Sequence, residues 1–287
     1  MKPTSLFTNR IAVLATMHQK EKAIAPILQA ELGVHVTVPK NFNTDSFGTF
    51  TRTIKRPNTQ IATARLKAEK ALELTGETLV IASEGSFAPH PSTPFIASNR
   101  EIVIVLDKKH NLEIIGEEFS LDTNHNHIVV QSVEQAFQFA DKIGFPEHGL
   151  VVMFSEYPTS SQEIIPGIIT PEQLIKSVNY VLENSPTGTA HLETDMRAMY
   201  NPTRMNNIAK ATQDLVRKIN SICPKCSAPG FAITKKIPGL PCALCHSPTL
   251  VTQTVIYQCQ KCGFTQEKPF PHTSQYADPA KCMYCNP

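Results

Sequence analysis

The sequence predicts an α/β fold, with a mixed sheet flanked by helices, followed by a small cysteine-rich module at the C-terminus. Short apolar runs typical of buried strands alternate with helical patterns up to residue 220. Two further apolar runs flank residues 108–111 (KKHN) as the arms of a hairpin would, which makes the sheet mixed rather than all-parallel. All eight cysteines lie after residue 222. We therefore expect two domains, residues 1–220 and 221–287.

The expected helices begin and end at recognisable signals. In residues 20–32, Ile24 and Leu28 share one helical face, and the following Gly33 provides a stop. Residues 58–75 are rich in Ala, Lys, Glu and Leu, which are good helix formers. Capping patterns predict three later helices: residues 132–143, a helix that begins at 170, and residues 201–220.

The expected strands are short and apolar, with little alternation, as in sheets that are covered on both faces. They are residues 10–15, 34–38, 79–82, 101–106, 112–119, 128–130 and 150–154. Their alternation with the helices favours the α/β architecture over separate runs of strands and helices.

The composition is that of an ordinary globular protein. The 287 residues are 41% hydrophobic and 18% charged, which excludes a disordered or fibrous chain. A net charge of +2 is too mild to indicate nucleic-acid binding by itself. No apolar run reaches the length of a membrane span, so we expect a soluble, cytoplasmic protein without a membrane partner. The sequence does not determine the oligomeric state, and a homo-oligomer is compatible with it.

The cysteines form four CxxC pairs of the kind that binds metal. Intervals of 15 and 19 residues separate the first pair from the second and the third from the fourth, as in four-thiolate zinc sites. Disulfides are disfavoured because the first 222 residues contain no cysteine, and a thioredoxin-like redox CxxC normally stands alone. We therefore expect two structural zinc ions, held by Cys223, Cys226, Cys242, Cys245, Cys259, Cys262, Cys282 and Cys285.

The division of the four pairs between two metals stays open. Sequential pairing, first with second and third with fourth, is the simplest arrangement, and an interleaved one is also compatible with the spacing. His246 and His272 could act as ligands, but eight thiolates suffice for two closed shells, which leave no position for catalysis. Residues 221–287 carry six Lys and Arg against two acids, so this zinc ribbon suits either nucleic-acid contact or docking against the first domain.

Two segments of the first domain carry candidate binding chemistry. Thr16, Lys20 and Lys22 lie where the first strand turns into the first helix, and the N–H groups and dipole of a helix N-terminus favour an anion. The alternative is a helix cap with solvated lysines. Glu84 ends an apolar strand beside Gly85, where ligands of α/β sheets bind, so it is a candidate for contact with substrate or Mg²⁺.

Two further segments concentrate charge. Arg65 and Lys67 stand on the second helix, where a solvated face is the default interpretation. Asp195, Arg197 and Arg204 belong to a segment that ends at the start of the last helix. Its arginines could clamp phosphate oxygens, or the segment could form an ion-pair network that holds the helix in place.

The order of these segments resembles the inosine/xanthosine triphosphatase-like fold, which includes the Maf type. In that family the first strand leads into a Thr-Asn-x-x-Lys-like turn, to which residues 16–20 (TMHQK) are similar. A helix rich in Ala, Arg, Lys and Glu follows, here residues 62–71, and then a strand that ends in an acidic, Gly-containing loop, here residues 81–87. Residues 45–50 (DSFGTF) are similar to the acidic Gly-Thr-Phe stretch before that helix. The resemblance covers roughly the first 90 residues.

The resemblance implies Mg²⁺-dependent hydrolysis of purine nucleoside triphosphates such as those of inosine and xanthosine. Lys20 would contact phosphate, Glu84 would hold Mg²⁺ or orient water, and Arg65 or Lys67 would line the triphosphate path. Arg197 would take the part of the family's late arginine near the base.

The leading hypothesis is therefore a Mg²⁺-dependent nucleoside triphosphate phosphohydrolase with two structural zinc ions. Asp195 would be a second metal-binding or orienting acid, and Thr16, Lys22 and Arg204 would belong to the substrate-binding set. Two alternatives stay open: a catalytically inactive nucleotide- or RNA-binding protein with a basic zinc-ribbon tail, and a protein that docks a partner. The whole-chain pattern, including residues 194–198 (TDMRA), is also similar to an uncharacterised bacterial family with a zinc-ribbon tail, which implies no activity.

Overall fold

The computed structural model describes residues 6–40, 42–44, 59–271 and 274–286. The chain divides into two compact units, Phe7–Val216 and Arg217–Pro287 with Met1–Leu6. The acidic Gly-Thr-Phe stretch over residues 45–50 lies outside the described residues. None of the described helices has the length and apolar character that a membrane span requires.

The first sheet of the larger unit is mixed, as the sequence predicts. Its elements in chain order are β1 (Ile11–Ala15), α1 (Glu21–Leu32), β2 (His35–Thr37), α2 (Gln60–Thr75), β3 (Leu79–His90), β4 (Thr93–Asp107) and β5 (Leu112–Ser120). The strand order is β2-β1-β3-β4-β5. β1 is parallel to both β2 and β3, whereas β3, β4 and β5 form an antiparallel meander.

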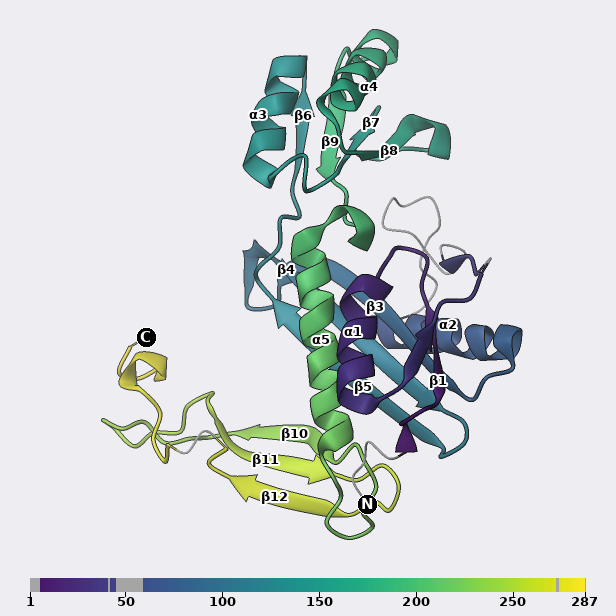
Figure 1. Ribbon diagram of the computed structural model, residues 1–287. Helices are drawn as coiled ribbons and strands as arrows, with labels where there is room; N and C mark the ends of the chain where they lie inside the picture. The colour runs from purple at the N-terminus through teal and green to yellow at the C-terminus, as the bar shows by residue number, and fades with distance from the viewer. Residues whose placement is uncertain (1–5, 41, 45–58, 272–273, 287) are drawn as a thin grey trace. The chain divides into compact units, whose positions relative to one another are not determined.

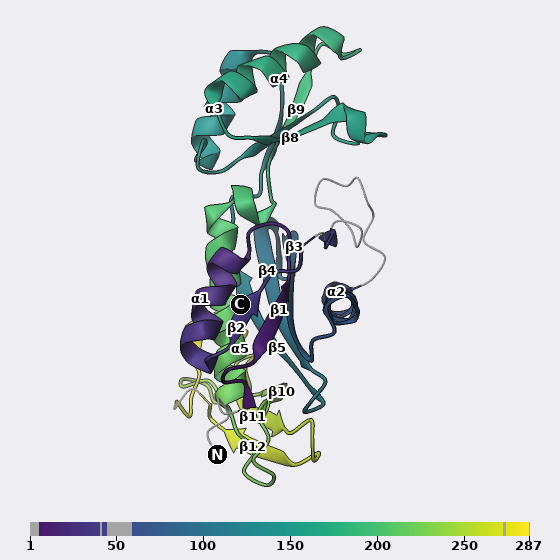
Figure 2. The ribbon, with the colours of Figure 1, turned by 45° about the vertical axis from the view of Figure 1, so that its right-hand side comes forward.

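Helices cover both faces of this sheet. α2 lies on one face, and α1 lies on the other together with the first part of α5 (Pro202–Asn220) (Figures 1 and 2). The α2 face is packed with small side chains, so that Ala64 and Ala68 join Val80 in one buried cluster. On the opposite face α5 approaches so closely that a Cβ added to Gly116 would lie 2.6 Å from the Cα of Leu215. Two layers of helix therefore bury the sheet.

The helix signals read from the sequence are confirmed. α1 ends at Gly33, which adopts φ +66° and donates its N–H to the carbonyl of Gln29. The capping box at Thr170 is formed, with the Gln173 N–H donating to the Thr170 hydroxyl at 3.3 Å. At the start of α5, the side-chain oxygen of Asn201 accepts a hydrogen bond from the N–H of residue 204 at 2.9 Å.

β3 is much longer than the strand predicted over residues 79–82. It continues through Glu84 to His90 and stays paired with β4, so that Glu84 lies opposite Ile102. The expectation that Glu84 ends the strand and begins a loop is therefore wrong. The hydrogen bonds between β3 and β4 join backbone groups, so the pairing continues after Ala82 although the side chains change from apolar to polar.

The larger unit contains a second sheet that the sequence did not separate from the first. Its elements are β6 (His127–Val130), α3 (Val133–Ile143), β7 (Leu150–Met153), the 3₁₀ turn η3 (Ser161–Glu163), β8 (Ile164–Ile168), α4 (Pro171–Asn184) and β9 (Ala190–Thr194). The strand order is β6-β9-β7-β8, and all three pairings are antiparallel. α3 and α4 share a buried core with these strands, in which Phe139, Leu150, Val178 and Leu192 take part. β8 and β9 were missed because each is five residues long and contains Pro and Gly or charged residues.

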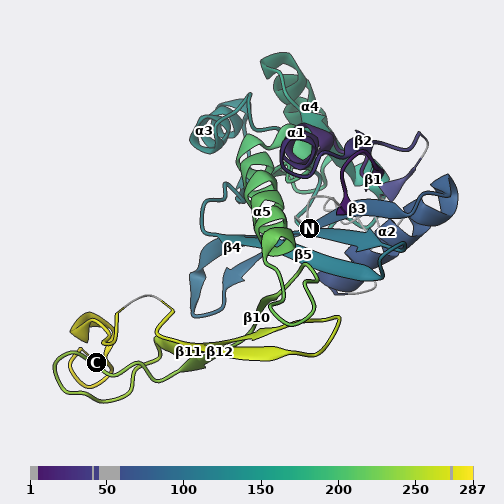
Figure 3. The same ribbon diagram turned by 60° about the horizontal axis from the view of Figure 1, so that its bottom comes forward.

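The C-terminal unit is built on a three-stranded antiparallel sheet. Its strands are β10 (Ala232–Pro238), β11 (Thr252–Gln258) and β12 (Thr265–Pro269), in that order across the sheet (Figure 3). A 3₁₀ turn, η5 (Pro279–Lys281), follows β12. The CxxC pairs lie in the loops before, between and after the strands, which places them at the two ends of the sheet.

Candidate functional sites

The eight cysteines form two groups of four thiols. In each group the four sulfur atoms all lie within 4.8 Å of one another. The first group combines the first and third CxxC pairs, and the second group combines the second and fourth. Interleaved pairing is therefore correct, and the simpler sequential pairing is wrong. The groups are Cys223, Cys226, Cys259 and Cys262, and Cys242, Cys245, Cys282 and Cys285.

The sulfur–sulfur distances fit a tetrahedral metal site. A Zn–S bond of about 2.3 Å gives a tetrahedron whose edges are about 3.8 Å. Between the sulfur atoms of different CxxC pairs, the distances in the first group are 3.7 Å (Cys223 to Cys262) and 3.6 Å (Cys226 to Cys259). They are 3.8 Å (Cys242 to Cys285) and 3.6 Å (Cys245 to Cys282) in the second. A disulfide requires about 2.0 Å, so all eight cysteines are free thiols.

The CxxC turns repeat one backbone pattern. The N–H of the residue that follows each pair donates to the carbonyl of the pair's first cysteine, at 2.9 to 3.0 Å. In three of the four turns that residue has a positive φ: Ser227 at 56°, His246 at 59° and Gly263 at 71°. His246 therefore closes a turn and is not part of either thiol group, whereas His272 lies outside the described residues.

Hydrogen bonding already favours thiolate formation in the second group. The side chain and the backbone of Ser247 lower the pKa of Cys245 to about 6, and a hydrogen bond with that thiolate raises the pKa of Cys285 to about 12. A divalent cation favours four thiolates over such proton sharing. Two four-sulfur groups with these distances can hold two metal ions and are consistent with zinc.

Five of the almost fully buried charged side chains in the described part of the larger unit lie on or beside β3 and β4. Lys20 precedes α1 and is 6% exposed, and Lys67 on α2 is 7% exposed. Glu84 on β3, Glu101 on β4 and Arg204 on α5 are 2%, 0% and 1% exposed. We call these five residues the charged cluster. The sequence singled out four of them: Lys20, Lys67, Glu84 and Arg204.

The charged cluster is divided between the two faces of the sheet, because successive side chains of β3 point in opposite directions. Glu84 shares the α2 face with Val80 and forms an ion pair with Lys67. Ser83 lies on the other face, where the Lys20 ammonium donates to its hydroxyl at 3.0 Å and to its carbonyl at 3.2 Å. Lys20 and Glu84 are therefore neighbours along β3 rather than partners across one cleft.

Arg204 and Glu101 form the second buried ion pair. The Arg204 Nε donates to the Glu101 Oε1 at 2.8 Å, and Nη1 donates to the Met196 carbonyl at 2.5 Å. The pair occupies the space above Gly85, where an added Cβ would overlap the Glu101 carboxylate and lie 2.6 Å from Arg204 Nη2. Gly85 therefore admits this ion pair, which corrects the expectation that it opens the strand to a substrate or Mg²⁺.

The charged cluster carries three cations and two carboxylates, a formal excess of one positive charge when all are ionised. Burial, and secondly the Arg204 guanidinium, lower the pKa of Lys20 from 10.5 to about 7, although Glu84 and Glu101 oppose the shift. The site therefore disfavours the charged form of Lys20 unless a ligand brings negative charge.

The other residues predicted for substrate binding have different surroundings. Thr16 is buried, and its hydroxyl accepts a hydrogen bond from the N–H of His18 at 3.3 Å, which caps the turn before α1. Arg65 makes a paired contact with Glu113 on β5, at 2.7 and 2.6 Å.

Asp195 and Arg197 pair with each other after the last strand of the second sheet. Arg197 Nη2 lies 2.6 Å from the Asp195 carboxylate, which also accepts the Gly167 N–H at 3.0 Å. The Arg197 guanidinium stacks on Tyr200, 4.6 Å from the ring centre. Met196 stands between the pair and contacts Arg204, so the ion-pair network weighed as an alternative for this segment is present.

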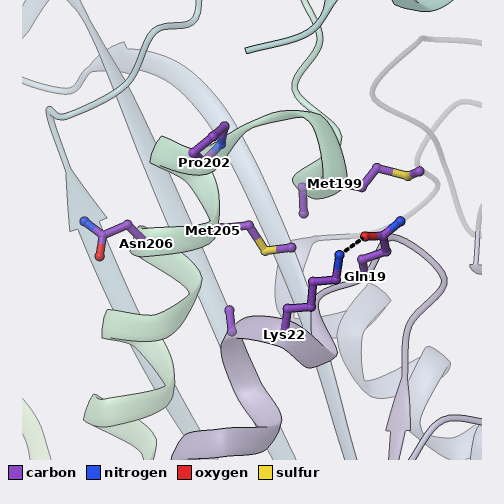
Figure 4. Close-up of a pocket in the computed structure, with 8 residues that line it drawn as sticks. Gln19, Lys22, Met199, Pro202, Met205 and Asn206 are labelled. Atoms are coloured by element: carbon purple, nitrogen blue, oxygen red, sulfur yellow. Dashed lines mark hydrogen bonds between the residues drawn. The ribbon is translucent and has the colours of Figure 1, made fainter. Parts of the chain in front are cut away.

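A cavity of about 440 Å³ is lined by residues that include Gln19 and Met205, the chain neighbours of Lys20 and Arg204 (Figure 4). One wall is the start of α1 with the residues before it, where the Lys22 ammonium donates to Gln19 Oε1 at 2.5 Å. The opposite wall is the 3₁₀ turn η4 (Ala198–Tyr200) and the start of α5, with Met199, Met205 and Asn206. The cavity thus combines apolar thioethers with amide groups and one exposed ammonium.

Sequence reasoning missed Glu101, together with the amides that surround it. Asn99 donates to Glu101 Oε1 at 3.0 Å, and Asn207 donates to Asn99 Oδ1 at 3.0 Å. The available signal was a carboxylate at the head of the apolar run over residues 101–106, where strand periodicity would bury it. A buried carboxylate requires a cation, and its partner is Arg204, which the sequence had assigned to substrate binding.

Comparison with known proteins gives a family but no activity. No curated protein matches the sequence. Residues 67–287, which are 221 of the 287, match the family described as "Domain of unknown function (DUF6671)". The matched segment contains both thiol groups and every member of the charged cluster except Lys20. The chain therefore belongs to the DUF6671 family.

Proposed function

We propose that the unit Phe7–Val216 is a Mg²⁺-dependent nucleoside triphosphate phosphohydrolase, and that the C-terminal thiol groups hold two structural zinc ions. The observation that carries the proposal is Lys20, a buried ammonium at the start of α1 whose pKa has fallen to about 7. A buried cation in a cluster with excess positive charge is unfavourable by itself, and an anionic ligand relieves it.

The position of Lys20 favours phosphate as that anion. Lys20 follows β1 and immediately precedes α1, whose first N–H groups and dipole attract negative charge. Arg204 supplies further positive charge from α5 on the same face of the sheet as Lys20, and Lys67 lies on the opposite face beside Glu84. The adjoining cavity, with Met199 and Met205 on one wall and Gln19 on the other, has room for the nucleoside.

Glu84 is the candidate for holding Mg²⁺ or for orienting the attacking water. A carboxylate oxygen is a ligand that Mg²⁺ prefers, and Glu84 would become available if Lys67 transferred its ion pair to a phosphate oxygen. Bound Mg²⁺ would supply charge neutralisation at the phosphates. In the reaction, the water oxygen bonds to phosphorus, one phosphoanhydride P–O bond breaks as the phosphate or pyrophosphate portion on its other side leaves as an oxyanion, and one proton of the water is released.

Turnover by the zinc-loaded full chain tests the proposal. Inosine, xanthosine, adenosine and guanosine triphosphates are supplied with and without Mg²⁺, without a chelator that would strip zinc, and released phosphate and pyrophosphate are measured. We expect Mg²⁺-dependent turnover that Glu84→Gln lowers by about 100-fold or more. Glu73→Gln, which makes the same change to an exposed carboxylate on the helix that carries Lys67, is the matched control. Absence of release from every nucleotide would contradict the proposal.

A catalytically inactive nucleotide- or RNA-binding protein is the second candidate. The observation that favours it is the ion pair between Glu84 and Lys67, which engages the carboxylate proposed for catalysis. Equilibrium dialysis with the same nucleotides separates the two candidates. Binding without release of phosphate or pyrophosphate selects the second.

A further inference from the structure

The two thiol groups of the C-terminal unit present different side chains to solvent. In each CxxC turn the third residue is exposed, and we call these four residues the tips. At the first group both tips are lysines, Lys225 and Lys261. At the second group they are Leu244 and Tyr284, which are 69% and 75% exposed. The two turns that form one thiol group therefore carry similar exposed side chains, which are basic in the first group and apolar or aromatic in the second.

These tips lie at opposite ends of the three-stranded sheet. The first group is formed where β10 begins and where β11 passes into β12, and the second is formed where β10 and β12 end. Because neighbouring strands are antiparallel, these positions are the two opposite ends. The sheet between them carries exposed Lys235 and Lys236 on β10 and exposed Lys268 on β12.

The end at the second group is rich in exposed apolar side chains. Leu250 is 78% exposed, Met283 is 64% exposed and Tyr276 is 49% exposed, in addition to the two tips. Tyr276 lies beside His246, with 5.8 Å between the ring centres. Large apolar groups gathered on one surface of a small metal-bound module indicate a binding surface.

The charge of the unit distinguishes between kinds of partner. Residues 217–287 contain eight Lys and Arg and two acids, a net of +6, whereas the whole chain has a net of +2. One of the two acids, Asp278, is engaged as the cap of η5, where it accepts the Ala280 N–H at 2.9 Å. Cations with so few carboxylates among them attract a polyanion.

We propose that the C-terminal unit binds single-stranded nucleic acid, with phosphates at Lys225 and Lys261 and along the sheet, and with a base stacked on Tyr284. Exposed aromatic rings stack on bases that are not already paired, which favours a single strand over a duplex. An acidic protein would satisfy the lysines but would leave the aromatic end in water. The closed four-sulfur shells supply rigidity to both tips.

Fluorescence anisotropy of labelled 12-nucleotide oligomers tests this proposal with the zinc-loaded full chain. Single-stranded RNA, single-stranded DNA and a duplex are titrated over a range of salt concentrations, and the first two arms distinguish RNA from DNA. We expect single strands to bind more tightly than the duplex. Tyr284→Ala should weaken binding about 5- to 100-fold without changing the salt slope, because stacking involves no counterion.

Removal of the lysine tips should have the complementary effect. Lys225→Ala together with Lys261→Ala should weaken binding and reduce the slope of log affinity against log salt by about 1.4, since each phosphate contact on a single strand contributes about 0.7. Lys70→Ala, an exposed lysine of α2 in the other unit, is the control for loss of charge. Zinc content, measured for each variant, shows that the turns remain formed.

Two results would overturn the proposal. One is the absence of salt-dependent binding to any single strand by the zinc-loaded protein. The other is self-association in sedimentation that Tyr284→Ala abolishes while nucleic-acid binding is unchanged, which would assign the apolar end to a second copy of the chain. Neither result depends on whether the larger unit hydrolyses nucleotides.

Discussion

Arg204 and Glu101 are joined by a fully buried ion pair, 2.8 Å from Nε to Oε1, that connects α5 to β4 across the space left by Gly85. The two residues are 103 positions apart in the sequence. The contact fixes the start of α5 against the first sheet, next to the loop that carries Asp195 and Arg197. Its energetics can be tested because each partner and the glycine can be changed separately.

Substitution of Gly85 by alanine should destabilise the protein by about 3 to 5 kcal/mol. The added methyl group overlaps the Glu101 carboxylate, so that the buried ion pair must separate or shift. Urea unfolding, followed through the transition of the larger unit, measures the change in the free energy of unfolding. Gly188→Ala is the control, because nothing lies within 4 Å of its added Cβ and only its φ of +62° opposes the substitution. Equal losses in the two variants would contradict the assigned role of Gly85.

Removal of one partner of the buried pair should be worse than removal of both. Arg204→Met leaves the Glu101 carboxylate buried without its cation, which should lower the free energy of unfolding by about 3 to 5 kcal/mol. Arg204→Met combined with Glu101→Leu replaces the pair by apolar groups and should recover most of that loss. A double-mutant cycle in urea gives the coupling energy. Additive effects of the two substitutions would show that the residues do not interact.

The buried Lys20 should make stability depend on pH above neutrality. Its pKa is about 7 in the folded protein and 10.5 as its ordinary value, so between these pH values the unfolded chain binds more protons. The stability contribution of Lys20 therefore rises with pH through this window. Relative to Lys20→Met, the wild-type protein should gain about 2 kcal/mol between pH 7 and pH 9.

The measurement is urea unfolding of both proteins at several pH values. Lys22→Met is the matched control, because the Lys22 ammonium lies at the surface two residues away. The difference between wild type and Lys22→Met should stay constant with pH. A constant difference for Lys20→Met as well would show that Lys20 is not desolvated in solution.

Local signals in the sequence predicted the helices, because a cap or a stop such as Gly33 acts within one turn. They did not predict the length of β3, since its polar half is held by pairing with β4 rather than by apolar periodicity. The second sheet was not predicted as a separate sheet for a similar reason. β9 joins β6 and β7, which are distant in sequence, and such pairings leave no local pattern.

The charged cluster was predicted in part for the same physical reasons. Lys20 and Glu84 stood out because each ends or follows an apolar run. Glu101 did not, because only the fold reveals that its partner is Arg204 and that Gly85 makes room for both. The CxxC spacing predicted groups of four thiols but not which pairs combine, because the order of strands in the C-terminal sheet decides which turns meet.

Zinc content of paired cysteine variants gives a direct test of interleaved binding. Cys223 and Cys259 belong to the same thiol group, so replacing both by serine should remove one of two zinc ions per chain. Cys223 and Cys242 belong to different groups, so the same double replacement should remove both. Sequential pairing predicts the reverse of these two results. The metal is quantified after dialysis by atomic emission, and the wild-type chain should contain two zinc ions. Because metal binding and folding of such modules are linked, loss of either ion should also increase proteolysis of the C-terminal unit.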